Sequence, residues 1–525
     1  MLLVVASVDA AWAQRAAEPA AGPTVGPSAD AGDAEHDPPV PSIVSGTSPR
    51  EDGVRVALVD SGVNYTLPDI AGALARHPDG TLVGHDFHDL DARPFDRFLL
   101  PGGRIVRHGT RTASVLIDEA PLARLVPYRF PQPDMTRMTA LVEHAARNGV
   151  RVVGLPLGGP KREPWVAFER AARAHPDILF VASAGNDGRD IDVTPIWPAA
   201  FTLDNLVVVT SADDFGALAG GVNRGRTSVD YLVPAEHVPV LRFDGSSGHA
   251  AGSSYAVPRV VALAARLFEG HPAWRAPELV AELRRRFADG SHPREVGEGF
   301  IVDPLAPGEP PARIVAERAF VPADGPAFAP TDEPADASAD APVPVAVRVP
   351  LDVIVPNDAW ERRRIDETLD RAASILAACA IALEPVRVRD VDAPARLADL
   401  TLGGARTLLH AVRASGPERR ATVVLARDTR MRADVYDGEA FGRGNTRHRP
   451  WLSDSVWLTA AIDDAGIALA HELFHLLVDS GAHDPRPDNL MQARTAGDNT
   501  RLDAAQCEAA HEVALANGLA HTGHP

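Results

Sequence analysis

The chain has 525 residues, of which 45% are hydrophobic and 23% are charged, so it has enough apolar material for packed cores and is not a mostly disordered protein. Its formal net charge is -19 at pH 7 and no basic patch stands out, which argues against nucleic acid as a partner. No apolar run reaches the roughly 20 residues that cross a bilayer, which excludes an integral membrane protein, and two cysteines exclude a disulfide-rich scaffold.

The first 13 residues have the composition of an export signal. An apolar stretch begins at Met1 and ends in Ala11-Trp12-Ala13, the small-x-small pattern that precedes a signal-peptidase cut. A frayed apolar N-terminus is the alternative, because no Lys or Arg precedes the apolar region and Asp9 interrupts it. We therefore expect residues 1–13 to be a signal peptide and the protein to be secreted or periplasmic.

At roughly 150 residues per domain, the length of the chain predicts two or three domains. Two stretches of low complexity divide it. Residues 14–50 and 304–344 are rich in Ala, Pro, Gly and Asp and lack a periodic apolar pattern. Such segments cannot bury enough surface to offset their conformational entropy, so both are predicted to be linkers. The remaining bodies are residues 51–303 and 345–525.

In the first body, short apolar runs alternate with amphipathic helical patterns. The predicted strands are 54–59, 150–155, 178–182 and 206–209, and the predicted helices are 135–148 and 165–175. This alternation predicts an α/β fold with a doubly wound parallel sheet. In such sheets the chemistry takes place beyond the carboxyl ends of the strands.

Three motifs of this body contain the groups that nucleophilic catalysis needs. Asp60 follows the first predicted strand in Asp-Ser-Gly, His108 opens a helix in His-Gly-Thr, and Ser254 lies in Gly-Ser-Ser-Tyr-Ala-Val-Pro. A serine hydroxyl is a poor nucleophile until a base such as histidine removes its proton, and a carboxylate can hold that histidine in the right tautomer. Each motif alone is weak, since a lone Ser254 would more often be a helix N-cap. The order Asp, His, Ser is nevertheless one of the known solutions.

Together these motifs resemble the subtilisin-like serine proteases over about residues 54–267. The segment Ala-Ser-Ala-Gly-Asn that ends at Asn186 resembles the one that carries the oxyanion asparagine, and Pro156-Leu-Gly-Gly resembles the segment that pairs with substrate backbone. The chain departs from the family with Pro156 for the usual Ser, Ser253 for Thr and Tyr255 for Met, and none of these changes removes a catalytic atom.

The resemblance implies a role for each site residue. Ser254 would be the nucleophile, His108 the general base and acid, and Asp60 its orienting partner. Asn186 would donate a hydrogen bond to the developing oxyanion. It also implies protein or peptide substrates, with Ile196 near the floor of a shallow apolar specificity pocket. The sequence assigns neither a calcium site nor an oligomeric state.

The second body contains His471-Glu472-Leu-Phe-His475. Two histidines four residues apart project from one face of a helix, where their nitrogens can bind Zn²⁺, and Glu472 beside them can act on a bound water. Incidental histidines are the alternative. The apolar flanks Ile-Ala-Leu-Ala and Leu-Leu-Val, however, predict a buried helix in which a stray charged triplet would be costly. Zn²⁺ is therefore the predicted cofactor.

Zinc needs a third protein ligand. The candidates downstream are His483, Asp479, Asp484 and Glu508. The whole stretch, with Asn-Leu-Met ending at Met491, resembles the metzincin zinc proteases, and this implies His483 as the third ligand and Met491 beneath the metal. The gap from the second histidine to His483 is two residues longer than in the usual metzincin pattern.

The rest of this body fits a smaller α+β zincin-like domain. Its predicted elements are strands at 349–355, 422–425 and 455–458, a helix at 360–380, and an edge at 437–442 that pairs with an extended substrate. Cys379 and Cys507 are either two buried thiols or a disulfide between helices, and export favours the disulfide.

The sequence thus predicts a secreted endopeptidase with a serine site and a zinc site in one chain. One alternative is a serine protease whose metal domain is only a binding or structural module. The other is a surface binding protein without catalysis, against which the complete triad argues.

Overall fold

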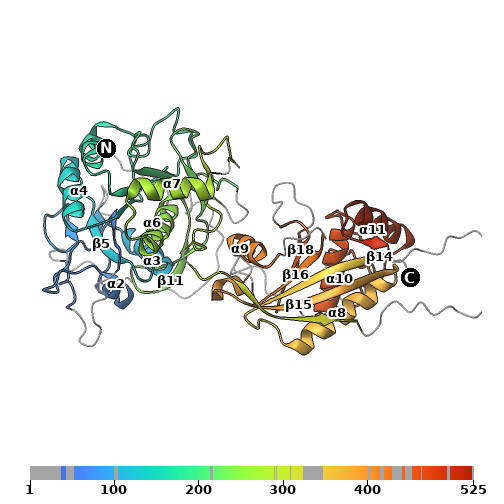
Figure 1. Ribbon diagram of the computed structural model, residues 1–525. Coiled ribbons are helices and arrows are strands. Elements are labelled where there is room, and N and C mark those ends of the chain that lie inside the picture. Colours follow the sequence, from blue (N-terminus) through green and yellow to red (C-terminus); the bar gives the residue numbers. More distant parts are fainter. Residues whose placement is uncertain are drawn as a thin grey trace, which may run out of the picture. The chain divides into compact units, whose positions relative to one another are not determined.

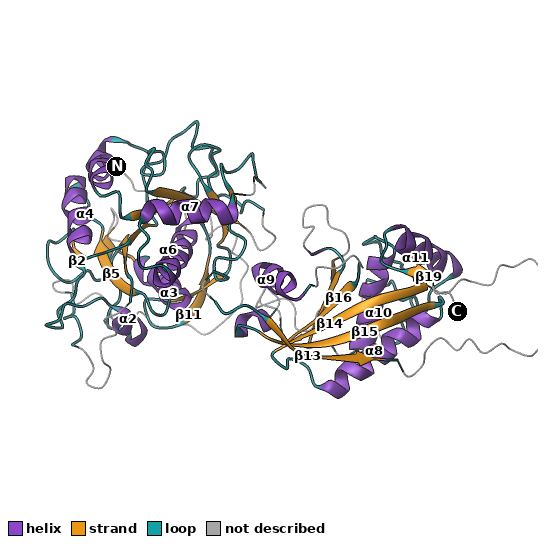
Figure 2. Ribbon diagram, viewed as in Figure 1, coloured by secondary structure: helices purple, strands orange, loops and turns teal. Residues whose placement is uncertain are grey.

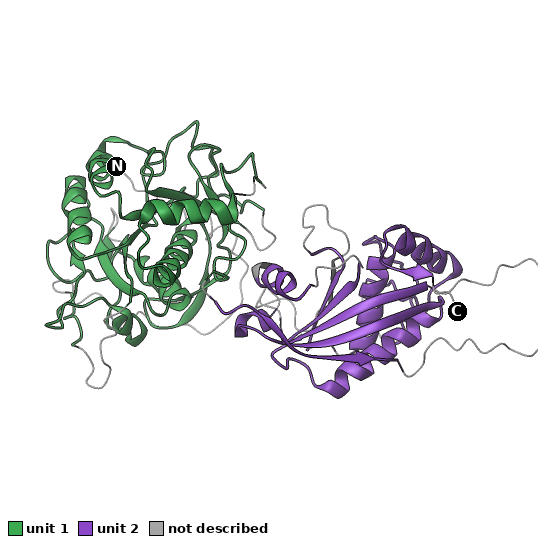
Figure 3. Cartoon of the chain, viewed as in Figure 1, with its two compact units in different colours: residues 1–308 green, residues 309–525 purple. Residues whose placement is uncertain are grey.

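The computed structural model divides the chain into two compact units, Met1–Gly308 and Glu309–Pro525, each of which is described by itself (Figure 3). The described residues are 37–42, 53–99, 105–212, 217–288, 290, 292–307, 309–322, 347–399, 402–413, 419–428, 440–443, 452–460, 462, 464–493 and 497–522. The predicted signal peptide, residues 1–13, lies outside them. Within the described residues, no helix is both long and apolar enough to cross a membrane.

The first unit is built on an eight-stranded sheet in the order β12-β9-β8-β7-β6-β1-β5-β2, and all of its strand pairs are parallel. Its longer strands are β1 (Arg55–Asp60), β5 (Arg124–Arg129), β6 (Val152–Leu155), β7 (Leu179–Ser183), β8 (Leu206–Ala212) and β9 (Tyr231–Pro234), and its short edge strands are β2 (His85–Asp86) and β12 (Gly299–Phe300). The four strands predicted in this body correspond to β1, β6, β7 and β8. The chain leaves β1 toward β5 on one side and returns to β6 on the other, so the doubly wound prediction is confirmed.

Helices cover both faces of this sheet because successive side chains of a strand point to opposite faces (Figure 2). Leu179 and Val181 of β7 belong to the core that includes α3 (Gly109–Glu119) and α6 (Ser253–Gly270). Phe180 points the other way and packs edge-on against Phe168, with ring centroids 5.1 Å apart. Phe168 lies on α5 (Val166–Ala174), which packs against α4 (Met138–Arg147). The other α-helices among the described residues of this unit are α2 (Pro68–Ala73) and α7 (Ala276–Phe287).

The second unit has a seven-stranded mixed sheet in the order β13-β15-β14-β16-β18-β17, with β19 beside β14 (Figure 1). Its strands are β13 (Arg313–Phe320), β14 (Val347–Pro356), β15 (Ile381–Asp392), β16 (Ala421–Ala426), β17 (Ala440–Arg443), β18 (Ser455–Thr459) and β19 (His521–Thr522). The four inner strands are parallel, whereas β13, β17 and β19 are antiparallel to their neighbours. Of the predicted substrate edge, 437–442, residues 437–439 lie outside the described part, and the rest begins the edge strand β17.

In the part of the second unit that the structure describes, the α-helices are α8 (Arg362–Ala377), α9 (Leu402–Val412), α10 (Ala465–Leu477) and α11 (Ala504–Ala516). Helices α8 and α10 share a core with one face of the sheet, and α9 packs on residues of the other face. The predicted disulfide is present: Cys379, just after α8, is bonded to Cys507 of α11, with their Cα atoms 5.1 Å apart.

The two predicted linkers both contain ordered residues. In residues 304–344, the segment Arg313–Phe320 forms β13 and pairs with β15, so the linker prediction needs correction there. Its strand signal was weak because most of its side chains are exposed and Pro, Ala and Asp surround it. In residues 14–50, the segment 37–42 lies on the first unit, where Tyr65 Oη donates to Pro38 O (2.6 Å). Residues 14–36, 43–50 and 323–344 are outside the described part.

A buried guanidinium connects segment 37–42 to the first sheet. Arg129, at the end of β5, contacts Asp86 Oδ2 (2.9 Å) and Asp89 Oδ2 (2.6 Å), and Asp37 Oδ2 lies 4.0 Å away. Asp37 also pairs with Arg97 at 3.1 Å. The side chains of Arg129, Asp37 and Asp86 are 5% exposed or less, so each carboxylate depends on a nearby guanidinium to offset its lost hydration.

We expect Arg129→Met to destabilise the first unit by about 3–5 kcal/mol, because it leaves buried carboxylates unpaired. Urea unfolding of the full chain measures this loss. Arg147→Met is the matched control, because the Arg147–Glu143 pair is exposed and such pairs contribute about 0–1 kcal/mol. Equal losses in the two variants would contradict this role of Arg129.

A second expectation concerns pH. His144 Nδ1 lies 2.8 Å from Tyr128 Oη, and burial lowers the pKa of His144 to about 4. Between pH 6.5 and 4 the unfolded chain therefore binds a proton at His144 that the folded chain does not, so stability is present above pH 6.5 and is lost as the pH falls. The urea midpoint should drop less between pH 7 and 5 in His144→Gln than in the unchanged chain, while His249→Gln, at an exposed position, should behave like the unchanged chain. A full drop in His144→Gln would refute this.

Candidate functional sites

Asp60 and His108 meet where β1 ends and α3 begins. Both Asp60 oxygens lie close to His108 Nδ1, at 2.9 Å (Oδ1) and 2.8 Å (Oδ2). Asp60 also accepts hydrogen bonds from the Ser61 backbone N–H (2.7 Å) and from Thr112 Oγ1 (2.9 Å). The carboxylate is therefore fixed on three sides, and it holds the imidazole with a proton on Nδ1, which leaves Nε2 as the basic nitrogen.

A buried aspartate that the sequence did not single out supports this contact. Asp96 is fully buried, and its Oδ1 accepts from Ser61 Oγ at 2.5 Å. Ser61 Oγ in turn accepts from the backbone N–H groups of His108 (3.0 Å) and Gly109 (2.9 Å), and Asp96 Oδ2 accepts from Thr110 N (2.9 Å). Burial raises the pKa of Asp96, which these hydrogen bonds oppose. Asp96 thus ties the end of β1 to the first turn of α3.

Ser254 lies in the first turn of α6 and is 9% exposed. Its hydroxyl donates to the carbonyl of Pro156, just after β6, at 3.2 Å. The ring of the next residue, Tyr255, lies 5.7 Å from the His108 ring, measured between centroids. The structure therefore brings the serine helix against the histidine, with the hydroxyl turned to a backbone carbonyl. Catalytic hydrogen bonds are often long or misaligned without substrate, so this geometry is compatible with a triad.

The side chain of Asn186, which follows β7, is oriented by Ser253. Its Oδ1 accepts from both the backbone N–H and the hydroxyl of Ser253, each at 2.9 Å, and the same hydroxyl lies 2.7 Å from Ser183 Oγ. Because Oδ1 is occupied, the amide NH₂ group is the part of Asn186 left to donate elsewhere. Ser253, a departure from the usual Thr, retains the hydroxyl that this contact needs.

The segment after β6 pairs with the loop that contains Ile196. Gly159 and Trp197 exchange two backbone hydrogen bonds of 2.8 Å. An added Cβ at Gly158 would lie 2.9 Å from Trp197 O and 3.2 Å from Ile196 Cγ2. Ile196 is 1% exposed. Ile196 is thus a buried side chain beneath Gly158, and its place near a pocket floor stays a prediction.

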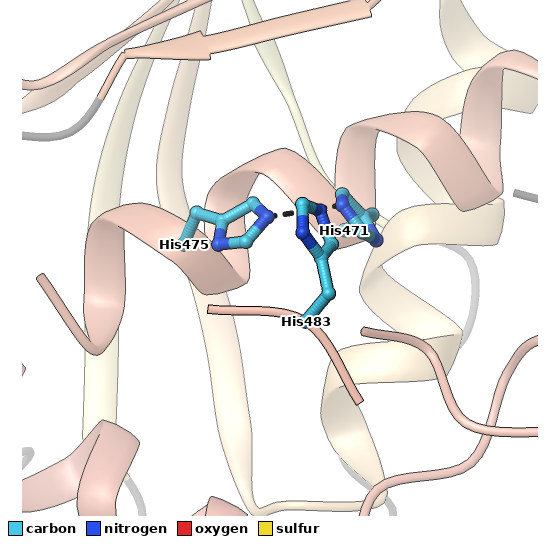
Figure 4. Close-up of side chains that lie close together, drawn as sticks. All are labelled: His471, His475 and His483. Carbon is cyan, nitrogen blue, oxygen red and sulfur yellow. Dashed lines mark hydrogen bonds between the residues drawn. The ribbon is translucent and has the colours of Figure 1, made fainter. Parts of the chain in front are cut away.

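In the second unit, three histidines converge on one point (Figure 4). His471 and His475 lie on α10, with their Nε2 atoms 3.0 Å apart, and the ring of His483 is 5.5 Å and 5.0 Å from theirs. The Nδ1 of His471 is 2.7 Å from Leu490 O, and the Nδ1 of His475 is 2.6 Å from Ser480 O.

A carbonyl oxygen can only accept a hydrogen bond, so the proton of each neutral ring is on Nδ1. The Nε2 atoms of His471 and His475, which face each other, therefore each carry a lone pair. Two lone pairs 3.0 Å apart repel each other unless a cation lies by them, and imidazole nitrogen is a preferred Zn²⁺ ligand. Burial also lowers the pKa of His471 and lowers that of His475 to about 4, which favours the neutral, ligating form. The residues fit a metal ion of the zinc type.

The other predicted residues of this site are placed as follows. Glu472 is 9% exposed on α10. Among the competitors for the third ligand, Asp479 and Glu508 are exposed, and Asp484 pairs with Arg486, which lowers its pKa to about 2. Met491 is buried, in the turn whose Leu490 carbonyl faces His471. The side chain close enough to His471 and His475 to share a metal ion with them is that of His483, which is itself exposed, and no acid is in this group.

Comparison with known proteins gives a match for the first unit. The model of the Subtilase family matches residues 51–299. The chain is 27% identical to the thermophilic serine proteinase of Bacillus sp. (strain AK1) over 229 residues, which is 41% of this chain and 52% of that protein. It is 25% identical to thermitase of Thermoactinomyces vulgaris over 229 residues, which is 41% of this chain and 75% of that protein.

Among solved structures, a cold adapted subtilisin-like serine proteinase matches 48% of this chain and 89% of its own, with 22% identity and a TM-score of 0.40. The chain spans about half the length of the Bacillus sp. relative and a quarter of the cell wall-associated protease of Bacillus subtilis. Residues 51–299 are a subtilase-family domain with the subtilisin-like parallel sheet, and the second unit lies outside the family match.

The Ser253–Asn186 contact generates a prediction for peptide cleavage. Asn186→Ala should lower kcat by about 10²–10³ if Asn186 is the oxyanion donor that the sequence predicts. Ser253→Ala should lower kcat by about fivefold, because one neutral hydrogen bond of about 1 kcal/mol is lost and the backbone N–H still holds Asn186. Ser253→Thr keeps the hydroxyl and is the matched control. If Ser253→Ala and Ser253→Thr have the same kcat, the hydroxyl does not orient Asn186.

Proposed function

We propose that the subtilase-family domain of this chain hydrolyses internal peptide bonds of protein substrates. The contact of both Asp60 oxygens with His108 Nδ1, beside the helix that begins with Ser254, is the observation that carries this proposal. The family match over residues 51–299 supports it, since the region includes the four residues predicted for the serine site.

The four side chains then have distinct roles in the reaction. His108 Nε2 takes the proton of Ser254 Oγ as the oxygen attacks the peptide carbonyl, and Asp60 stabilises the imidazolium that forms. The Asn186 amide donates to the negative oxygen of the tetrahedral intermediate. His108 passes its proton to the leaving amine, and water then releases the acyl group from Ser254 by the same steps in reverse.

The second unit is proposed to be a zinc peptidase domain of the metzincin kind. His471, His475 and His483 would hold Zn²⁺, which supplies a water with its pKa lowered to about 7. Glu472, beside His471 on α10, is the group that moves a proton in this site. The antiparallel edge strand β17, next to β18, would pair with an extended substrate.

Export to an oxidising compartment is also proposed. The Cys379–Cys507 disulfide supports it, because disulfides persist in secreted and periplasmic proteins and are rare in the cytosol. The composition of residues 1–13 points the same way.

Two variants separate the serine site from the zinc site. Ser254→Ala should abolish labelling by a fluorophosphonate and all cleavage that a serine-directed inhibitor blocks, since the alanine has no hydroxyl to attack the carbonyl. Glu472→Gln should leave that cleavage unchanged and remove the cleavage that a chelator blocks. Peptide hydrolysis by the full chain, with the two inhibitors applied separately and together, measures both. If Ser254→Ala leaves no cleavage and chelators have no effect, the second unit is a binding or structural module.

A further inference from the structure

A pair of side-chain amides lies behind the three histidines. Asn489, in the turn before Met491, is 3% exposed. Its Nδ2 donates to Gln506 Oε1 (2.9 Å), and Gln506 Nε2 donates back to Asn489 Oδ1 (3.2 Å). The reciprocal pair joins the turn 489–491 to the first turn of α11, and neither side chain belongs to the proposed ligand set.

The turn 489–491, which Asn489 holds, forms hydrogen bonds with His471 and with the loop that carries His483. Asn489 Oδ1 also accepts from the backbone N–H of Met491 at 2.8 Å. Between these two residues, the Leu490 carbonyl receives the Nδ1 proton of His471 at 2.7 Å. The Met491 carbonyl accepts from the Asp484 backbone N–H, next to His483, at 2.7 Å. One turn therefore sets the ring orientation of His471 and the position of the loop that carries His483.

Gln506 is itself fixed from the other side. Its Oε1 accepts from the Asp503 backbone N–H (3.0 Å), and its own N–H donates to Asp503 Oδ1 (2.8 Å), which is the capping box of α11. Its neighbour Cys507 is bonded to Cys379, beyond the end of α8. The amide of Gln506 therefore has little freedom to follow a turn that moves away.

We propose that Asn489 and Gln506 are positioning residues that preorganise the three histidines, so that their amide pair sets the affinity of the site for Zn²⁺. This rests on the proposed function, in which these histidines hold zinc. Groups that orient metal-binding histidines typically change metal affinity by about 10–100-fold when they are lost. The pair acts through the Leu490 carbonyl on His471 and through the Met491 carbonyl on the His483 loop.

The test is the Zn²⁺ dissociation constant of the full chain, measured by competition with a chromogenic chelator. Asn489→Ala and Gln506→Ala should each weaken Zn²⁺ binding by about 10–100-fold. Gln506→Glu keeps the oxygen that accepts from Asp503 and Asn489 but loses the Nε2 donor, so its affinity should be intermediate. Glu512→Gln, at an exposed position further along α11, is the matched control and should bind like the unchanged chain.

The outcomes distinguish failure of the positioning role from failure of the zinc site itself. If the unchanged chain binds Zn²⁺ and both alanine variants bind it equally well, the positioning role is overturned and the zinc site stands. If the unchanged chain binds no Zn²⁺, the proposed zinc site is overturned and the positioning role with it. If an alanine variant loses the helical circular dichroism of the second unit, the milder Gln506→Glu decides, and unchanged affinity there overturns the proposal.

Discussion

The first unit depends on keeping a buried carboxylate within hydrogen-bonding distance of an imidazole on another element. Asp60 is 5% exposed, and a charge so placed is stable only if polar groups replace its hydration. Ser61, Thr112 and His108 supply those groups, and Asp96 holds Ser61 in turn. The close approach of α3 to β1 also requires glycine at 109, where a Cβ would lie 1.9 Å from Gly62 O.

Much of this architecture can be read from the sequence, because its signals are local. The runs that predicted β7 and β8 are uninterrupted, and those that predicted β1 and β6 each contain one Arg at their second position. Strand β5 was missed because it begins and ends with Arg and Pro127 divides its short apolar stretch. The Asp-Ser-Gly and His-Gly-Thr motifs are short and contiguous. Asp96 and the Ser253–Asn186 contact could not be found in this way, because each depends on residues 14 to 67 positions away that only the fold brings together.

The second unit shows the same limit at its histidines. Spacing on one helix predicts that His471 and His475 share a face, since residues four apart lie one above the other. The third member, His483, was chosen over three acids from the metzincin resemblance alone, because a loop of irregular length has no period from which to place a side chain. Two hydrogen bonds shape that loop, one from His475 Nδ1 to Ser480 O and one from Asp484 N to Met491 O. Both use backbone atoms, which every residue type has, so the order of residue types does not reveal them. The amide pair of Asn489 and Gln506 is invisible for the same reason.

The Cys379–Cys507 disulfide closes a covalent loop of the chain, and the candidate metal site of the second unit lies within that loop. The two cysteines are 128 positions apart, and His471, Glu472, His475 and His483 all lie between them. A single nick anywhere in that loop leaves both fragments joined, so the histidines stay on one molecule even if a peptide bond of the loop is cut. If the first unit cuts peptide bonds as proposed, the second unit can be cut once in this loop by the same chain without losing a fragment. Only a second cut or reduction of the disulfide would release a piece of it.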